Sequence, residues 1–191
     1  MLYYIHGYQS EPNSTKGTLF KEKLNAIPIK YRDCKPEQLK IPDAIKKIKK
    51  QIQNDNNAIL IGSSLGGLLA AKTALQLPNN IKQLILLNPA IIPPTQDITK
   101  IQGIPEHILK EMQDPQLFKQ KIKPEIFIIA GTMDDTVPNW WVVEFAKTQE
   151  ATIQFLHDDH SLTQHINKLP NIIKKCLDGH WDKIKMILPS Q

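Results

Sequence analysis

The sequence predicts an α/β fold, a three-layer sandwich in which a mainly parallel sheet of about six strands lies between helices. Two observations predict it. Short apolar segments typical of strands alternate along the chain with longer helical patterns. The central apolar segments lack polar alternation, which indicates a sheet covered on both faces. The chain has 191 residues, 41% of them hydrophobic, which suits a single domain over 1–191.

Each element has its own signal. The expected strands are residues 2–5, 29–32, 58–61, 84–87, 126–129 and 152–156. The weaker segment 29–32 is predicted to lie at an edge of the sheet. The expected helices are residues 14–26, 42–53, 65–77, 139–148 and 164–178. Isoleucines recur every three or four residues in 42–53, and Pro42 suits a first helical turn. Helix 65–77 is apolar on most sides, so we expect it to be buried.

One segment interrupts this alternation. Residues 89–123 hold five of the fourteen prolines and show no strand pattern. A connection of that length inside a compact domain is usually functional, so we predict a short lid-like insertion. Its helical part is expected at 105–119. The C-terminal tail, 179–191, is assigned no element, and it could dock on the domain or be loose.

Composition argues against several classes of protein. The net charge is +5, from 24 basic and 19 acidic residues, and Arg32 is the one arginine. Nucleic-acid readers usually rely on arginine forks, so we expect the lysines to lie on solvated faces and no nucleic-acid partner. The longest apolar segment, 58–71, is too short to cross a bilayer, so no membrane association is expected.

The two cysteines also limit the possibilities. Cys34 and Cys176 are far apart and have no metal or redox spacing. We expect no disulfide framework, no metal and no cofactor, and a cytoplasmic location. The N-terminus has no signal-peptide pattern.

The strongest chemical signal is the motif at residues 62–67, Gly-Ser-Ser-Leu-Gly-Gly. It matches G-x-S-x-G with Ser64 at the centre, between a predicted strand and a predicted helix. This is the nucleophile elbow of α/β hydrolases, in which a strained turn exposes the serine hydroxyl. Glycines two residues before and after the serine avoid side-chain clashes in that turn. Ser63 has no glycines at those offsets, so Ser64 is the predicted nucleophile.

A second motif, Ile5-His6-Gly7-Tyr8, ends the first predicted strand. In this fold the loop after that strand supplies one backbone N–H of the oxyanion hole, and the residue after the nucleophile supplies the other. The predicted donors are therefore the N–H groups of Tyr8 and Leu65. His6 precedes the elbow in the chain, which is the wrong order for a catalytic base. We expect it to hold the shape of the loop.

The acid and the base should follow later strands, because the order in this fold is serine, acid, histidine. Asp134 and Asp135 both follow the predicted strand 126–129, and this pattern alone leaves either possible. His160 follows the last predicted strand and is better placed than His157 or His165. A neutral imidazole there could take the serine proton and return it to the leaving group.

The chain resembles the YqiA-like esterases, a small bacterial branch of the α/β-hydrolase superfamily. The resemblance is carried by residues 4–10 (Tyr-Ile-His-Gly-Tyr-Gln-Ser), 62–67, 87–90 (Leu-Asn-Pro-Ala) and 159–161 (Asp-His-Ser). It implies an α/β-hydrolase fold of about six strands, with Asp134 as the acid and His160 as the base. It also implies carboxylesterase activity on short acyl esters.

These observations predict a serine hydrolase that acts on a small-molecule acyl ester, as a monomer or homodimer. A thioesterase, amidase or acyltransferase would use the same triad, and a non-catalytic binding protein on this scaffold is a further alternative. The expected pocket residues lie on loops near Ser64: His6, Tyr8, Ile91, Ile92, Met133, Trp140 and Trp141. If they line the pocket, it is apolar and suits an acyl chain.

Overall fold

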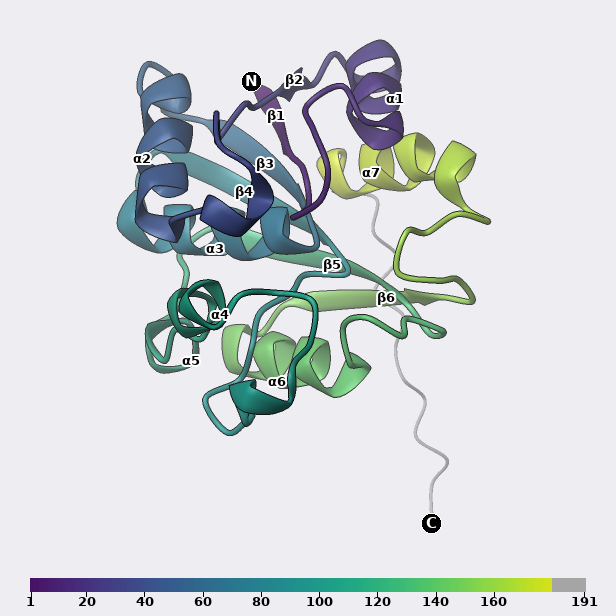
Figure 1. Ribbon diagram of the computed structural model, residues 1–191. Helices are drawn as coiled ribbons and strands as arrows, with labels where there is room; N and C mark the ends of the chain where they lie inside the picture. The colour runs from purple at the N-terminus through teal and green to yellow at the C-terminus, as the bar shows by residue number, and fades with distance from the viewer. Residues whose placement is uncertain (180–191) are drawn as a thin grey trace.

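The structure, a computed structural model, describes residues 1–179, and these contain a six-stranded sheet (Figure 1). The strands are β1 (Leu2–Ile5), β2 (Ile27–Pro28), β3 (Ala58–Ser63), β4 (Ile81–Leu87), β5 (Glu125–Gly131) and β6 (Thr152–Leu156). Their order is β2-β1-β3-β4-β5-β6, and each neighbouring pair is parallel. The strand after the elbow, β4, pairs with both β3 and β5 at the centre.

Helices cover both faces of the sheet. They are α1 (Thr15–Leu24), α2 (Ile41–Ile52), α3 (Leu65–Gln76), α4 (Glu106–Met112), α5 (Gln116–Lys119), α6 (Asn139–Gln149) and α7 (Leu169–Leu177). Alternate strand residues feed two separate apolar clusters. Tyr3 and Ile5 pack with α2, α3 and α6, whereas Tyr4 packs with α1 and α7. The helices α1 and α7 contact each other on that second face (Figure 1). The predicted three-layer α/β architecture is confirmed.

The weak strand lies at an edge of the sheet, as predicted, but its bounds were wrong, because β2 ends before residue 29. β2 consists of Ile27 and Pro28, which pair with Tyr3 and Tyr4 of β1, and the N–H of Ile29 donates to the carbonyl of Tyr4 at 2.8 Å. The side chains of Tyr31 and Arg32 serve another purpose, because both donate hydrogen bonds to carbonyl groups of the loop after β1. The segment therefore leaves the sheet direction in order to support that loop.

Two predicted helices were too long. The insertion contains α4 and α5 in place of one helix over 105–119, because Pro115 lies between them and a proline inside a helix removes a hydrogen bond. The last helix, predicted from residue 164, begins at Leu169. The carboxylate of Asp158 accepts hydrogen bonds from the backbone N–H groups of Gln164 and His165, which holds these residues in a turn.

Most of the insertion packs on the domain. Ile108, Leu109, Met112 and Leu117 are buried in the same cluster as α2, α3 and α6. The backbone N–H of Ile41, where α2 begins, donates to Glu111 of α4 at 2.6 Å. Of the predicted tail, 179–191, all but Gly179 lies outside the described residues. No helix within 1–179 is long and apolar enough to cross a membrane.

Because the strands are parallel, their carboxyl ends meet at one edge of the sheet, where α/β proteins bind ligands. The loops after β1, β3, β5 and β6 carry Tyr8, Ser64, Asp134 and His160, respectively. The fold therefore brings together residues that are up to 152 positions apart, from Tyr8 to His160.

Candidate active site

Ser64 lies in a strained turn between β3 and α3. Its backbone angles are φ 54° and ψ −120°, a positive φ that residues with a side chain rarely adopt. The N–H of Ser64 donates to the carbonyl of Leu87 on β4 at 2.9 Å, and the N–H of Ala90 donates to the carbonyl of Ser64 at 3.1 Å. These two hydrogen bonds, to the end of β4 and to the loop that follows it, stabilise the strained turn.

The glycines around the serine are needed for close backbone contact. A Cβ at Gly62 would lie 2.4 Å from the carbonyl oxygen of Gly66, and a Cβ at Gly66 would lie 2.0 Å from that of Ile5. Both distances are far inside van der Waals contact and involve backbone atoms that cannot move aside. The turn can therefore form only with glycine at both positions, as the motif predicted.

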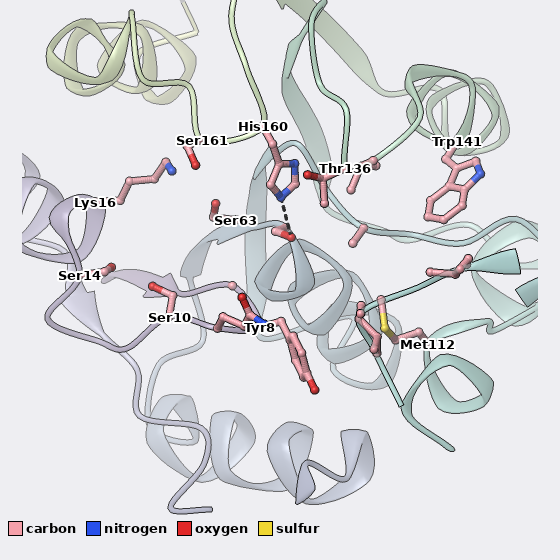
Figure 2. A pocket seen from close by; sticks show the side chains of 18 of the residues that line it. Tyr8, Ser10, Ser14, Lys16, Ser63, Met112, Thr136, Trp141, His160 and Ser161 are labelled. Carbon is pink, nitrogen blue, oxygen red and sulfur yellow. Dashed lines mark hydrogen bonds between the residues drawn. The ribbon is translucent and has the colours of Figure 1, made fainter. Parts of the chain in front are cut away.

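Ser64, His160 and Asp134 form one chain of hydrogen bonds. His160 Nε2 lies 3.0 Å from Ser64 Oγ, a contact drawn as a dashed line in Figure 2. His160 Nδ1 lies 2.8 Å from Asp134 Oδ2. The other carboxylate oxygen, Asp134 Oδ1, accepts from the backbone N–H groups of Thr136 at 2.9 Å and Val137 at 2.8 Å. The carboxylate is thus fixed in place, and its side chain is 1% exposed.

The other candidates for acid and base lie elsewhere. Asp135 is exposed, and its carboxylate accepts from the Thr136 hydroxyl. His157 is exposed and lies 3.4 Å from the Thr132 hydroxyl. His165 Nδ1 lies 2.9 Å from the buried Asp158 carboxylate, on the loop after β6. Of the described aspartates and histidines, His160 is the one in hydrogen-bond contact with Ser64, and Asp134 is the carboxylate in contact with His160.

Tyr8 and Leu65, the predicted oxyanion donors, both lie next to Ser64. Leu65 is the first residue of α3, where N–H groups have no helical acceptor. Tyr8 lines the cavity that contains Ser64, and a Cβ on Gly7 would lie 3.4 Å from Ser64 Cβ. The positive end of the α3 dipole also points to this position. The two N–H groups therefore lie on the elements that an oxyanion hole requires.

The loop after β1 is held by side chains that sequence reasoning missed. The guanidinium of Arg32, which is 4% exposed, donates to the carbonyls of Tyr8 and Ser10 at 3.2 and 2.7 Å, and to Glu11 at 2.9 Å. The Tyr31 hydroxyl donates to the carbonyl of Gly7 at 3.0 Å. Arg32 is the one arginine of the chain, a signal that could have marked it for such a role.

His6 is buried and forms part of this support. Its ring stacks on Tyr31 with 4.3 Å between the ring centroids, and Nδ1 lies 2.9 Å from the carbonyl of Gly7. A carbonyl can only accept, so Nδ1 carries the proton. Burial in this apolar position lowers the pKa of His6 from 6.5 to about 4, so the ring is neutral in the folded protein at neutral pH.

This pKa predicts a loss of stability in mild acid. The unfolded chain binds a proton at His6 near pH 6.5 and the folded chain only near pH 4, so stability is full above about 6.5 and falls as the pH decreases towards 4. We expect a decrease of about 2 kcal/mol in the free energy of unfolding from about pH 7.5 to about pH 5. Urea unfolding of the wild type and His6→Phe at both pH values measures it. The same pH dependence in both proteins would contradict the assignment.

Asn88 links the base loop to the acid loop. It is 1% exposed and has a positive φ of 43°. Its amide nitrogen donates to the carbonyls of Asp159 and His160 at 3.2 and 2.8 Å. Its amide oxygen accepts from the N–H of Gly131 at 2.7 Å, at the end of β5. One side chain thereby sets the distance between the two loops. The motif Leu-Asn-Pro-Ala had marked this position without giving its role.

A cavity of about 860 Å³ opens over Ser64 and His160. Most of its apolar lining residues belong to the same cluster as α3 and α6, whereas Tyr4 and Ile166 belong to the cluster on the other face. Among those of the first cluster are Ile92, Ile101, Ile104, Leu109, Met112, Val137 and Trp141. Most of these come from the insertion between β4 and β5. Trp141 Nε1 donates to Gln96 of the insertion at 3.3 Å, which fixes the insertion against α6. The predicted insertion therefore forms one wall of the cavity.

Of the predicted pocket residues, Tyr8, Ile92 and Trp141 line this cavity, and the prediction was wrong for four others. Ile91 and Trp140 were placed wrongly because adjacent residues point in different directions: Ile91 packs in the core, and Trp140 is 46% exposed on the outer side of α6. Met133 is 44% exposed on its turn, and His6 lies behind the loop against Tyr31.

The arrangement has the parts that are needed to attack an acyl carbon. No group of three His, Cys, Asp or Glu side chains within 1–179 is placed to hold a metal ion. A hydroxyl in contact with an imidazole, which is itself in contact with a fixed carboxylate, is the arrangement of a nucleophile, a general base and an orienting acid.

Sheet order, elbow and loop positions are those of the α/β-hydrolase fold, and solved structures of that fold superpose on the chain. Est1E from Butyrivibrio proteoclasticus, solved with ferulic acid bound, is 19% identical with a TM-score of 0.78 over 93% of this chain and 88% of its own. A monoacylglycerol lipase from Paleococcus ferrophilus is 16% identical, with a TM-score of 0.73 over 94% of both chains. The mouse alpha/beta hydrolase domain-containing protein 10 is 16% identical, with a TM-score of 0.69 over 93% of this chain and 89% of its own.

The chain belongs to the protein family described as the uncharacterised protein family UPF0227, whose model matches residues 1–176. This is the YqiA-like esterase family, so the resemblance that the motifs indicated is confirmed. A search of curated proteins gave no match.

Proposed function

We propose that the protein is a serine hydrolase that cleaves carboxylic esters with short acyl chains through a covalent acyl-enzyme. The observation that carries the proposal is the unbroken contact from Asp134 through His160 to the strained Ser64, at the floor of a cavity. Nucleophile, base and acid occupy the loops that this fold uses for them. The names of the superposed esterase and lipase agree with a hydrolase.

The first half of the reaction forms the acyl-enzyme. His160 Nε2 takes the proton of Ser64 Oγ as the oxygen bonds to the ester carbonyl carbon. The carbonyl oxygen becomes negative and is stabilised by the N–H groups of Tyr8 and Leu65. The bond between carbon and the leaving oxygen then breaks, and the proton on His160 passes to that oxygen, so the alcohol leaves neutral. Asp134 stabilises the imidazolium in between.

The second half releases the acid. A water molecule gives its proton to His160 Nε2 as its oxygen bonds to the acyl carbon. The bond to Ser64 Oγ breaks, and the proton returns from His160 to Ser64. One ester and one water thus give one alcohol and one carboxylic acid, and the three side chains return to their starting states.

The cavity supports a short acyl chain. The apolar residues of the insertion and Trp141 offer an apolar surface for it, and transferring such a chain out of water is favourable by about 0.8 kcal/mol for each buried CH₂ group. α4 and α5 are short and packed on the core, so they limit the space that an acyl chain can occupy.

We also propose a cytoplasmic location, supported by Cys34 and Cys176, which are both free thiols.

Hydrolysis of p-nitrophenyl esters from acetate to palmitate tests the proposal, together with labelling by a fluorophosphonate. We expect short esters such as butyrate to have the highest kcat/KM, and the label to be found on the peptide that contains Ser64. A maximum at palmitate would contradict the short acyl preference. No hydrolysis of any ester, with no label on Ser64, would contradict the serine esterase itself and favour the binding-protein alternative.

A further inference from the structure

The cavity has a second part that an acyl chain cannot explain. Figure 2 shows Ser10, Ser14, Lys16 and Ser161 on one side of the hydrogen bond that His160 makes, with Met112 and Trp141 on the other. We call the first group the polar lobe. One side presents hydroxyls and an ammonium group, and the other is mainly apolar, with the Thr136 hydroxyl beside His160 as an exception. A ligand that fills both must therefore have two chemically different ends.

Lys16 gives the polar lobe its charge. Apart from His160, no other side chain that can carry a charge is found among the described residues that line the cavity, and no aspartate or glutamate is among them. Lys16 is half-buried, and burial lowers its pKa against the opposing influence of Asp159 and Asp158. A partly desolvated ammonium group interacts with an anion more strongly than an exposed one does.

The two nearby aspartates are engaged within their own loop. Asp158 accepts from the N–H groups of Asp159, Gln164 and His165, and lies 2.9 Å from the His165 ring. Asp159 accepts from the N–H of Thr163 at 3.0 Å. Within 1–179 neither carboxylate forms an ion pair with Lys16, although the charges of both act on it. The ammonium group is therefore placed to interact with a ligand.

The start of α1 adds to this effect. Ser14 caps the helix by accepting from the N–H of Gly17, and Ser14, Thr15 and Lys16 all line the cavity. The N-terminal turn of a ten-residue helix carries partial positive charge. Lys16, the helix end and the hydroxyls all favour negative charge at one place.

We propose that the polar lobe binds an anionic group, a carboxylate or a phosphate, on the alcohol part of the ester. This rests on the proposed function. The acyl chain occupies the apolar side, and the tetrahedral carbon on Ser64 Oγ then directs its leaving oxygen to the other side of His160. His160 Nε2 returns the proton to that oxygen as the bond between carbon and oxygen breaks. The alcohol leaves with its anion still beside Lys16.

Two esters of nearly the same shape test the anion site: the butyrate ester of 4-hydroxybenzoate, which carries a carboxylate, and the butyrate ester of 4-hydroxybenzamide, which carries a neutral carboxamide. Each kcat/KM is divided by the rate of hydroxide hydrolysis of the same ester, which removes the difference in leaving-group reactivity. We expect wild type to prefer the carboxylate by about tenfold, through KM, and Lys16→Met to abolish that preference. Lys16→Arg should retain it. Lys21→Met, an exposed lysine on the same helix, is the matched control.

The outcomes are distinct. If wild type hydrolyses both esters without a preference, or if Lys16→Met keeps the preference, the anion site is wrong and the esterase stands. If wild type hydrolyses neither ester nor any p-nitrophenyl ester, the esterase proposal fails, and the anion site fails with it. A thermal midpoint of Lys16→Met within about 3 °C of that of wild type shows that the variant is folded.

A second experiment distinguishes a carboxylate from a phosphate as the group that the polar lobe binds. Benzoate and phenyl phosphate are compared as inhibitors of p-nitrophenyl butyrate hydrolysis. Competitive inhibition by one of them, weakened about tenfold in Lys16→Met, identifies a carboxylate or a phosphate as the preferred group. Equal inhibition of wild type and Lys16→Met by both would contradict the site.

Discussion

Ser64→Ala is expected to lower kcat for p-nitrophenyl butyrate by a factor of about 10⁴ to 10⁶, with little change in KM. The variant loses the hydroxyl oxygen that lies 3.0 Å from His160 Nε2. The activity that remains comes from binding and the oxyanion donors acting on water. Steady-state kinetics measures the effect. A decrease smaller than about tenfold would exclude Ser64 as the nucleophile.

The strain at Ser64 supplies the control for folding. Alanine has the same backbone restriction at φ 54° as serine, so the thermal midpoint of Ser64→Ala should stay within about 3 °C of wild type. Glycine accepts a positive φ, so Ser64→Gly should be more stable by about 1 kcal/mol and equally inactive. An inactive protein that is more stable than wild type would show that the elbow maintains strain for function.

Much of this fold was predictable because its strands and glycines carry local signals. The strand β6 matched its predicted range, and β3, β4 and β5 extended only a few residues beyond theirs, since buried parallel strands form continuous apolar runs. The elbow was also predictable, because the backbone clashes at Gly62 and Gly66 leave no other residue possible. Local sequence is sufficient where the constraint is itself local.

The parts that were missed depend on contacts between distant segments. The edge strand was misplaced because Tyr31 and Arg32 bind the loop after β1, more than twenty residues earlier in the chain. The start of α7 was misplaced because Asp158 holds the preceding turn. The bridging amide of Asn88 joins loops that are 43 and 72 residues away. Periodicity contains no information about such partners.

The pocket was predicted least well, for a geometric reason. Loop position identifies which segment approaches Ser64, but the direction of a side chain depends on the turn in between. Trp140 and Trp141 are neighbours in sequence, yet only Trp141 faces the cavity. The polar lobe could not be predicted either, because α1 reaches the cavity only through the packing of its first turn.

Asp134→Asn is expected to reduce kcat by about 10⁴ while leaving the fold intact. The physical reason lies in the second oxygen. Asp134 Oδ1 accepts from the N–H groups of Thr136 and Val137, so the amide oxygen of an asparagine must take that position. The amide NH₂ then faces His160 Nδ1 and donates to it. Nδ1 becomes the acceptor, Nε2 carries the proton, and His160 cannot accept the proton of Ser64.

Asp135→Asn is the matched control for this substitution. Asp135 is adjacent in sequence, and its replacement by asparagine removes the same negative charge. Its exposed carboxylate, however, contacts only the Thr136 hydroxyl among the described hydrogen bonds. We expect its kcat to stay within about twofold of wild type, because exposed charges contribute little. Equal losses in both variants would indicate a general effect of negative charge on the loop. A loss in Asp135→Asn alone would reassign the acid, since the two residues compete for one role and the hydrogen bond to His160 decides between them.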